Sequence, residues 1–300
     1  MNVRTYRTPE AFKMALEQKL RSRSSSGGDF ARRRQLLVFD RFLARVVATM
    51  GDRVILKGGL VIELRIERAR TTKDIDLSVM GDPGEILEQL REAGRLDLGD
   101  FMTFEISPDA GHPVIQNEGM RYDGLRYRSE TRLAGKIYGQ PFGVDVAFGD
   151  PIFGEPDVVL TEDVLNFAGV APPAVRLYPV ETQIAEKLHA LTMPRDLENS
   201  RVKDLPDIAL LALVREIDET VLRKALELTF GYRATHTIPT SVPEPPDSWG
   251  TIYARMAIED QLPWASFFDL VSAVGRFMDP ILSVKLRRRW DPIRWEWSAN

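Results

Sequence analysis

The chain has 300 residues, of which 44% are apolar and 28% are charged, a balance typical of a globular protein with a sizeable core in one large or two ordinary domains. The net charge of −4 excludes a general polycation, and the absence of cysteine excludes disulfides and Cys-ligated zinc or iron–sulfur sites. Residues 1–18 lack the apolar core of a signal peptide, and no run of 18 apolar residues occurs. We therefore expect a cytoplasmic protein with no membrane partner.

The first part of the chain mixes helices with strands. Helices are predicted over 9–21, 30–50, 60–68 and 85–93, and strands over 53–56, 74–80, 101–106, 120–128, 131–138 and 144–148. Most of these strands follow one another through turns rather than through helices. The pattern indicates an α+β lobe with a mixed sheet and not a series of βαβ units.

The second part of the chain is mainly helical. From about residues 166–175 onward, helices are predicted over 179–192, 204–217, 218–230, 252–262 and 264–282. We therefore expect two domains, a sheet-containing lobe with N-terminal helices over 1–170 and a helical lobe over 171–300.

Two acids lie on one face of the strand at 74–80. Because strand side chains alternate between faces, Asp74 and Asp76 share the face opposite the apolar residues Ile75 and Leu77. Their Cα atoms are roughly 6.6 Å apart along an extended strand. Neighbouring carboxylates repel unless a cation joins them, and Mg²⁺ prefers such oxygen ligands. The alternative is ordinary salt bridges with nearby Arg or Lys side chains.

A third acid interrupts the apolar strand at 144–148. Asp145 points away from the face that holds Val144 and Val146. If this strand lies beside the one that carries Asp74 and Asp76, three carboxylates converge. The third either completes a metal site or takes the proton of an attacking hydroxyl.

A glycine turn precedes these strands. Lys57, Gly58 and Gly59 stand between a short strand and a predicted helix. Glycines allow a ligand to approach the backbone, and a helix N-terminus offers free N–H groups that bind phosphate. The alternative is a tight turn without a ligand, because the turn matches neither a P-loop nor a G-x-G-x-x-G motif.

Four segments together resemble a known family. Lys57-Gly58-Gly59, TTKDIDL (71–77), QIAEKLHALT (183–192) and RVKDLPDIALL (201–211) are similar to the motifs of AbiEii/AbiGii-type nucleotidyltransferases. These are polymerase-β-like enzymes that include the MenT-like toxins of toxin–antitoxin pairs. The resemblance extends from about residue 30 to 282.

The resemblance implies a bilobed enzyme with an antitoxin partner. Such an enzyme moves a nucleotide from an NTP to an acceptor and releases pyrophosphate, and MenT-like members add nucleotides to the 3′ end of tRNA. It also implies that Asp74 and Asp76 hold Mg²⁺ and that Lys187 contacts the triphosphate. Asp207 and Asp204 match the two acids of the last motif.

One position departs from the family pattern. Polymerase-β-like enzymes often have Ser after the glycine of the cradle, whereas Leu60 stands here. The triphosphate must then rely on backbone N–H groups, Lys57 and Lys187. The resemblance also makes Thr72 a candidate for regulatory phosphorylation beside the metal-binding acids.

Several roles have a structural alternative. Lys187 and Asp207 either serve the leaving pyrophosphate or simply pair to join two helices. Arg70 either binds phosphate or is solvent-exposed. The basic and aromatic stretch over 121–128 is a candidate for holding an RNA acceptor and stacking a base. The acceptor hydroxyl can alternatively belong to a protein or small molecule, and the chain can alternatively be a non-catalytic nucleotide-binding or RNA-binding module.

Overall fold

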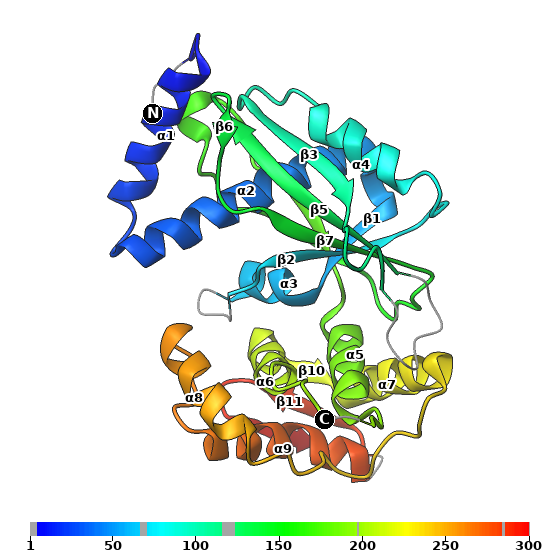
Figure 1. The fold of residues 1–300 in the computed structure, drawn as a ribbon. Coiled ribbons are helices and arrows are strands. Elements are labelled where there is room, and N and C mark those ends of the chain that lie inside the picture. The colour runs from blue at the N-terminus through cyan, green and yellow to red at the C-terminus, as the bar shows by residue number, and fades with distance from the viewer. Residues whose placement is uncertain (1–4, 67–70, 116–123, 197, 284–285, 300) are drawn as a thin grey trace.

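The computed structural model describes residues 5–66, 71–115, 124–196, 198–283 and 286–299. The chain forms two lobes, a sheet lobe at the top of Figure 1 and a mainly helical lobe below it. None of the helices in these described ranges is long and apolar enough to cross a membrane.

The sheet lobe is built on a nine-stranded mixed sheet. Its strands are β1 (Val54–Lys57), β2 (Asp74–Val79), β3 (Met102–Pro108), β4 (Val114–Ile115), β5 (Gly124–Leu133), β6 (Lys136–Ile137), β7 (Phe142–Phe148), β8 (Asp157–Leu160) and β9 (Ala174–Leu177). The main order is β3-β5-β7-β2-β1-β9-β8, and β4 and β6 both pair with β5. The β2–β7 and β1–β9 pairs are parallel and the others are antiparallel. The predicted α+β class with a mixed sheet is confirmed.

Helices pack against one face of this sheet and form a single hydrophobic core with it. They are α1 (Pro9–Ser22), α2 (Gly27–Met50), α3 (Gly58–Arg65), α4 (Ile86–Arg95) and two 3₁₀ turns, Gly51–Arg53 and Asn166–Ala168. Thr8 and Ser26 cap α1 and α2 through their hydroxyls. The core includes Phe42 of α2 and the apolar residues Ile75 and Leu77 of β2. Because side chains alternate along β2, Asp74 and Asp76 lie on the opposite face.

The second lobe has five helices among its described residues. They are α5 (Val180–Thr192), α6 (Asp204–Val214), α7 (Glu219–Arg233), α8 (Trp249–Glu259) and α9 (Phe267–Ser283), and an antiparallel sheet joins β10 (Ile217–Asp218), β11 (Arg288–Asp291) and β12 (Glu296–Ala299). Trp290 of β11 is fully buried in this lobe's core and donates its indole N–H to the carbonyl of Ala212 at 2.8 Å. The small sheet therefore closes the helical lobe.

Several element boundaries differ from the prediction. Strands were expected over 120–128 and 131–138, but 124–133 form one continuous strand, β5, and a turn at Ala134 and Gly135, which both have positive φ angles, leads to the short β6. Residues 120–123 lie outside the described part of the chain. The helix expected to start at residue 60 already starts at Gly58, and the helix expected over 204–217 ends at Val214. The strands β8 to β12 were not predicted because they are short and lack a clear alternation.

The two cores divide the chain close to the expected domain boundary. The described residues of the first core end at Leu177, and those of the second begin at Val180, apart from Ile62 of α3. Strand β9 follows residue 170 and pairs with β1 and β8 of the large sheet. The division into 1–170 and 171–300 stays a prediction.

Candidate active site

Four charged residues form one row across the centre of the large sheet. In the pairing register, Lys57 of β1 lies opposite Asp76 of β2, Asp76 opposite Asp145 of β7, and Asp145 opposite Arg126 of β5. The expectation that the strands carrying Asp76 and Asp145 are neighbours is confirmed. The order of charges along the row is positive, negative, negative, positive, so two carboxylates are adjacent at its centre.

Arg126 holds the outer carboxylate of this row. Its Nε and Nη2 atoms donate to Oδ1 and Oδ2 of Asp145 at 2.7 and 2.6 Å, a bidentate geometry that favours both charged forms. The hydrogen bonds that Arg126 donates to Asp145 raise the pKa of the guanidinium. Arg126 was not singled out for this role in the sequence, because its partner is 19 residues away.

Of the two acids in this row, Asp76 has the less complete compensation of its negative charge. Burial raises the pKa of its carboxyl to about 6, and the neighbouring Asp145 adds to the shift, whereas Lys57 and Lys187 act in the opposite direction. The carboxylate lies over Gly58, whose φ of +72° favours glycine and whose position leaves no room for a Cβ beside Asp76. A buried carboxylate with a raised pKa beside another acid is stabilised by a cation.

Asp74 stands in the next row of the sheet. Asp74 lies opposite Gly143 of β7, and Gly143 lies opposite Arg128 of β5. The backbone N–H of Gly143 donates to Asp74 Oδ1 at 3.1 Å, and a Cβ on Gly143 would lie 2.7 Å from that oxygen. Gly143 therefore makes room for the exposed Asp74 carboxylate, a role that the sequence did not reveal because Gly143 precedes the strand predicted over 144–148.

The glycine turn presents the N-terminus of α3 to these acids. Lys57 is the N-cap residue and makes no side-chain capping bond, so the first N–H groups of α3 remain for a ligand. Gln183 of α5 donates its Nε2 to the Gly58 carbonyl at 2.7 Å and fixes the turn from the second lobe. Leu60 packs in the first core and makes no polar contribution to the turn.

Lys57 itself joins the two lobes. Its ammonium contacts Asp150 Oδ2 at 2.5 Å and Glu186 Oε2 of α5 at 3.1 Å, and Arg233 of α7 contacts Glu186 at 3.3 Å. Burial opposes the ionisation of Glu186, but Lys57 and Arg233 hold its pKa below the ordinary value. Asp150 and Glu186 were missed from the sequence, since neither belongs to a regular pattern of acids.

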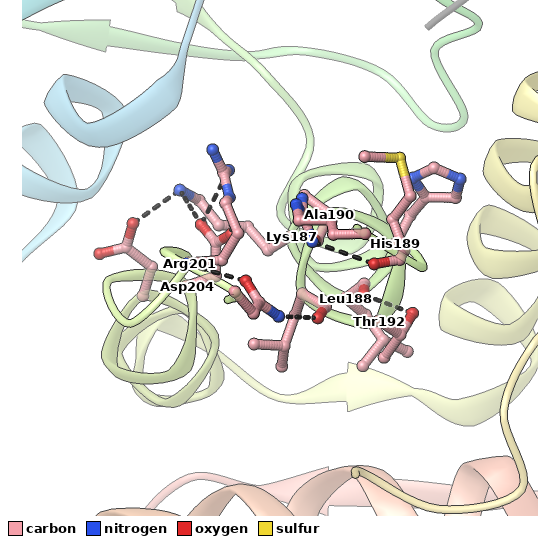
Figure 2. A network of polar contacts seen from close by, with 12 residues as sticks. Lys187, Leu188, His189, Ala190, Thr192, Arg201 and Asp204 are labelled. Atoms are coloured by element: carbon pink, nitrogen blue, oxygen red, sulfur yellow. Dashed lines mark hydrogen bonds and ion pairs between the residues drawn. The ribbon is translucent and has the colours of Figure 1, made fainter. Parts of the chain in front are cut away.

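Lys187 is held by the two acids of α6. Its Nζ lies 2.6 Å from Asp207 Oδ2 and 3.2 Å from Asp204 Oδ1, and Arg201 donates its Nε to Asp204 Oδ2 at 2.6 Å. Figure 2 shows Lys187 and Arg201 reaching the acidic side chains beside them. The pairing of Lys187 with Asp207, which the sequence left as one alternative, is present. Lys187 also lines the same cavity as Asp76, where its charge opposes the rise in the pKa of that carboxyl.

These groups surround one cavity of about 440 Å³ between the lobes. Its lining includes the three acids Asp74, Asp76 and Asp145, the turn Lys57, Gly58 and Gly59, and Thr72, Lys187, Arg201 and Asp204. The Thr72 hydroxyl donates to the Asp74 carbonyl at 3.3 Å, and its backbone N–H donates to Glu63. Arg70, predicted to bind phosphate, lies outside the described residues.

The acids are not yet arranged around a single ion. Within the described ranges, no three His, Asp or Glu side chains form a group that could hold a metal as it stands. Both oxygens of Asp145 contact Arg126, and one oxygen of Asp74 accepts from Gly143. The donor set is nevertheless that of a hard cation, since Asp76 and its neighbours supply only carboxylate oxygens. The metal-binding roles of the three acids stay predictions.

One part of the expected acceptor site is wrong. Tyr127 is only 5% exposed and packs in the first core, on the side of β5 opposite Arg126 and Arg128, so its ring is not available to stack a base. Arg128 is exposed. Residues 121 and 122 lie outside the described part of the chain.

The chain has two lobes, an α+β sheet lobe and a helical lobe, and the acids on its central strands face a glycine turn. This is the architecture of a nucleotidyltransferase, and comparisons with known proteins support the same class. The family model described as "Nucleotidyl transferase AbiEii toxin, Type IV TA system" matches residues 41–275. The chain therefore belongs to the AbiEii nucleotidyltransferase toxin family. Family membership makes it an NTP-dependent nucleotidyltransferase of a toxin–antitoxin system, with an NTP substrate and an antitoxin partner.

Two solved structures are similar to the chain at low sequence identity. The MenT4 nucleotidyltransferase toxin Rv2826c from Mycobacterium tuberculosis H37Rv is 15% identical, with a TM-score of 0.57 over 94% of this chain and 92% of that one. JHP933 from Helicobacter pylori is also 15% identical, with a TM-score of 0.45 over 84% of this chain and 91% of that one. The first likeness confirms the predicted nucleotidyltransferase fold. No curated protein matches the chain.

Proposed function

We propose that this protein transfers a nucleotide from an NTP, with Mg²⁺, to the 3′ end of a tRNA and releases pyrophosphate. The observation that carries the proposal is the adjacency of Asp76 and Asp145 in one sheet row, on the wall of a cavity that also contains the α3 N-terminus and Lys187. The tRNA acceptor is supported by the resemblance of the sequence motifs to MenT-like toxins. An enzyme with this acceptor acts in the cytoplasm.

Asp74 and Asp76 would hold the Mg²⁺ ion, because they share one face of β2 and line the cavity. When bound, the ion would supply positive charge to the triphosphate and to the attacking hydroxyl. Asp145 can join these two acids only after Arg126 leaves its carboxylate. Arg126 then becomes a second cation at the site, suited to a phosphate oxygen.

The chain's own groups divide between binding and proton transfer. Lys57, Lys187 and the N–H groups at the N-terminus of α3 bind the triphosphate and stabilise charge on the departing pyrophosphate. Asp145 is positioned to accept the proton of the acceptor hydroxyl, since it lies beside Asp76 on the next strand. Asp207 and Asp204 position Lys187 by holding its ammonium group.

Thr72 is proposed as a regulatory position of this site. Its hydroxyl lies on the cavity wall, next to the backbone of Asp74. A phosphate there would add negative charge beside the acids and compete with the triphosphate for the same cations. Mass spectrometry of the protein purified from its host, with the activity of Thr72→Glu compared with that of Thr72→Val, tests this role.

A labelled-nucleotide panel tests the proposed reaction. Purified protein is incubated with Mg²⁺, total tRNA and each labelled NTP in turn, and the products are separated by size before and after RNase treatment. Transfer of label to tRNA by the wild type, and its loss in Asp76→Asn, is the expected result. Asp82→Asn is the matched control, because Asp82 lies in an exposed turn outside the cavity.

The same experiment separates the alternative acceptors. Label that resists RNase and migrates with a protein or a small molecule would move the activity to another acceptor hydroxyl. Equal transfer by wild type and Asp76→Asn would refute the assigned role of the sheet acids.

A further inference from the structure

A second cavity adjoins the active site. It has a volume of about 960 Å³ and is lined by the start of α2, the turn that enters β7, Arg128 of β5 and residues Glu259 to Gln261 after α8. The two cavities share the wall formed by Thr71, Thr72, Lys73 and Asp74. Asp74 therefore stands at the boundary between them.

The sheet leaves a passage at this boundary. Arg128, Gly143 and Asp74 are consecutive positions across β5, β7 and β2. Because Gly143 has no side chain, no atom beyond the backbone stands between Arg128 and the Asp74 carboxylate in this row. The next row begins with Arg126 and Asp145 on the same face. A group that enters from the second cavity over Gly143 thus reaches the acids directly.

The charges at this passage suit a polyanion. Lys73 and Arg128 are exposed, and neither forms an ion pair with any residue that the structure describes. Other arginines of the cavity are already paired: Arg33 contacts Asp29 at 3.0 Å and Arg34 contacts Glu17 at 3.3 Å. Two cations without an ion-pair partner among the described residues therefore line this cavity, Arg128 opposite Gly143 and Lys73 next to Asp74, in a protein with a net charge of −4.

The end of α8 adds an acidic part to the lining of this cavity. Glu259 and Asp260 line the second cavity, and Asp260 Oδ1 accepts from the Thr71 backbone N–H at 3.0 Å. A phosphate backbone is thus attracted to the side of Lys73 and Arg128 and repelled from the side of α8. This asymmetry favours a nucleic-acid ligand that runs along β5 and the turn that enters β7.

The geometry of in-line displacement indicates which substrate enters the second cavity. The attacking hydroxyl must approach the α-phosphate from the side opposite the leaving pyrophosphate. Lys187 and the α3 N-terminus, the groups suited to pyrophosphate, line the first cavity and not the second. We infer that the second cavity receives the 3′-terminal nucleotides of an RNA acceptor, with Arg128 and Lys73 binding their phosphates. This assignment rests on the proposed transfer to RNA and adds the path by which the RNA enters.

Two variants test the path without touching the NTP cavity. Arg128→Glu reverses the charge at the passage, and Gln140→Trp fills the second cavity from its exposed turn. Arg95→Glu is the matched control, because Arg95 is exposed on α4, away from both cavities. Binding of a fluorescein-labelled single-stranded RNA is measured by anisotropy over a range of salt concentrations, and binding of labelled NTP is measured separately.

We expect Arg128→Glu to weaken RNA binding about tenfold. The slope of the logarithm of the binding constant against the logarithm of the salt concentration should become smaller in magnitude by about one. Gln140→Trp weakens RNA binding as well, whereas NTP binding by both variants, and RNA binding by Arg95→Glu, stay at the wild-type level. RNA binding that is unchanged in both cavity variants would overturn the assignment, even if the wild type transfers nucleotides to tRNA. Wild-type protein that binds RNA through Arg128 but transfers nothing to it supports the cavity and ends the proposed reaction instead.

Discussion

Two clusters of arginine and aspartate in the sheet lobe differ in how they balance charge. In the first, Arg41 and Arg45 of α2 both contact Asp100, at 2.7 and 2.6 Å, and the three side chains are at most 2% exposed. Burial works against the ionisation of Asp100, but Arg45 and Arg41 hold its pKa below the ordinary value. This cluster is closed and borders neither of the two cavities at the site.

The second cluster is the sheet row at the candidate active site. There Arg126 compensates Asp145, but Asp76 shares Lys57 with Asp150 and Glu186, and burial raises the pKa of Asp76 to about 6. The row also lines a cavity. The same residue types therefore make a structural tie where the buried carboxylate is paired with two arginines, and a binding site where a carboxylate is left for a cationic ligand.

The largest expected effect is the loss of activity in Asp76→Asn. The amide keeps the size of the side chain but removes the charge that would hold Mg²⁺, so we expect the rate of nucleotide transfer to fall at least about a thousandfold, or about 4 kcal/mol of transition-state stabilisation. Because ionised Asp76 is unfavourable in the free protein, the melting temperature stays the same or rises. Transfer kinetics with saturating NTP and a thermal melt of the same sample measure both quantities. A variant that melts early would mean that Asp76 is a structural residue like Asp100.

Asp100→Asn gives the opposite pattern. Removing the shared carboxylate leaves the buried Arg45 without an acidic partner and Arg41 with only Asp40, at 3.5 Å, and we expect the free energy of unfolding to fall by about 3–5 kcal/mol. The activity per folded molecule stays unchanged, since none of the three residues lines the cavity. Urea unfolding at constant pH measures the stability. A loss below about 1 kcal/mol would show that the closed cluster contributes no more than a surface pair.

A smaller effect is expected for Gly143→Ala. The added Cβ would lie 2.7 Å from Asp74 Oδ1, so the carboxylate must move away from the β7 backbone. We expect about a tenfold loss of transfer activity, equal to about 1.4 kcal/mol, with a higher Mg²⁺ requirement. Gly231→Ala in α7 is the control, because a Cβ there meets no atom within 4 Å and alanine favours a helix. Unchanged activity of Gly143→Ala at limiting Mg²⁺ would separate Asp74 from the site.

The sheet acids were predictable because they depend on local periodicity. Asp74, Asp76 and Asp145 each interrupt an apolar alternation, and the strands that carry them are adjacent, with Asp76 opposite Asp145. The glycine turn was equally visible, since Gly58 lies between a strand and a helix. Local patterns of this kind identify a residue's face and its element, which was sufficient to gather the centre of the site.

The partners of these acids were not predictable from local pattern. Arg126 reaches Asp145 through antiparallel pairing, and Lys57 reaches Glu186 across 129 residues of sequence. Asp150 stands in a loop after β7, where no periodicity marks it. Long-range ion pairs depend on how the lobes pack, so a single sequence contains no direct signal for them. The same reason explains the missed strands β10 to β12, which form only because the last residues return to Ile217.

A third polar cluster surrounds His189 of α5, whose imidazole is neutral in the folded protein. His189 is 1% exposed, and Arg233 lies 3.3 Å from its Nδ1 and Thr235 2.8 Å from its Nε2. Because a guanidinium only donates, Nδ1 must accept, and the proton is therefore placed on Nε2, which donates to the threonine hydroxyl. Burial lowers the pKa of His189 to about 3, and the Arg233 charge adds to the shift.

The lowered pKa of His189 predicts that the protein loses stability at acidic pH. The unfolded state binds a proton near the ordinary pKa of 6.5 while the native state does not, so the free energy of unfolding decreases as the pH falls from there toward 3. The contribution of His189 amounts to about 1 kcal/mol over the first pH unit below 6.5. Urea unfolding of wild type and His189→Gln at several pH values measures this contribution. The difference between their free energies of unfolding should narrow by about 1 kcal/mol between pH 6.5 and about pH 5.5. An equal slope of stability against pH for wild type and His189→Gln would show that His189 is protonated in the folded protein.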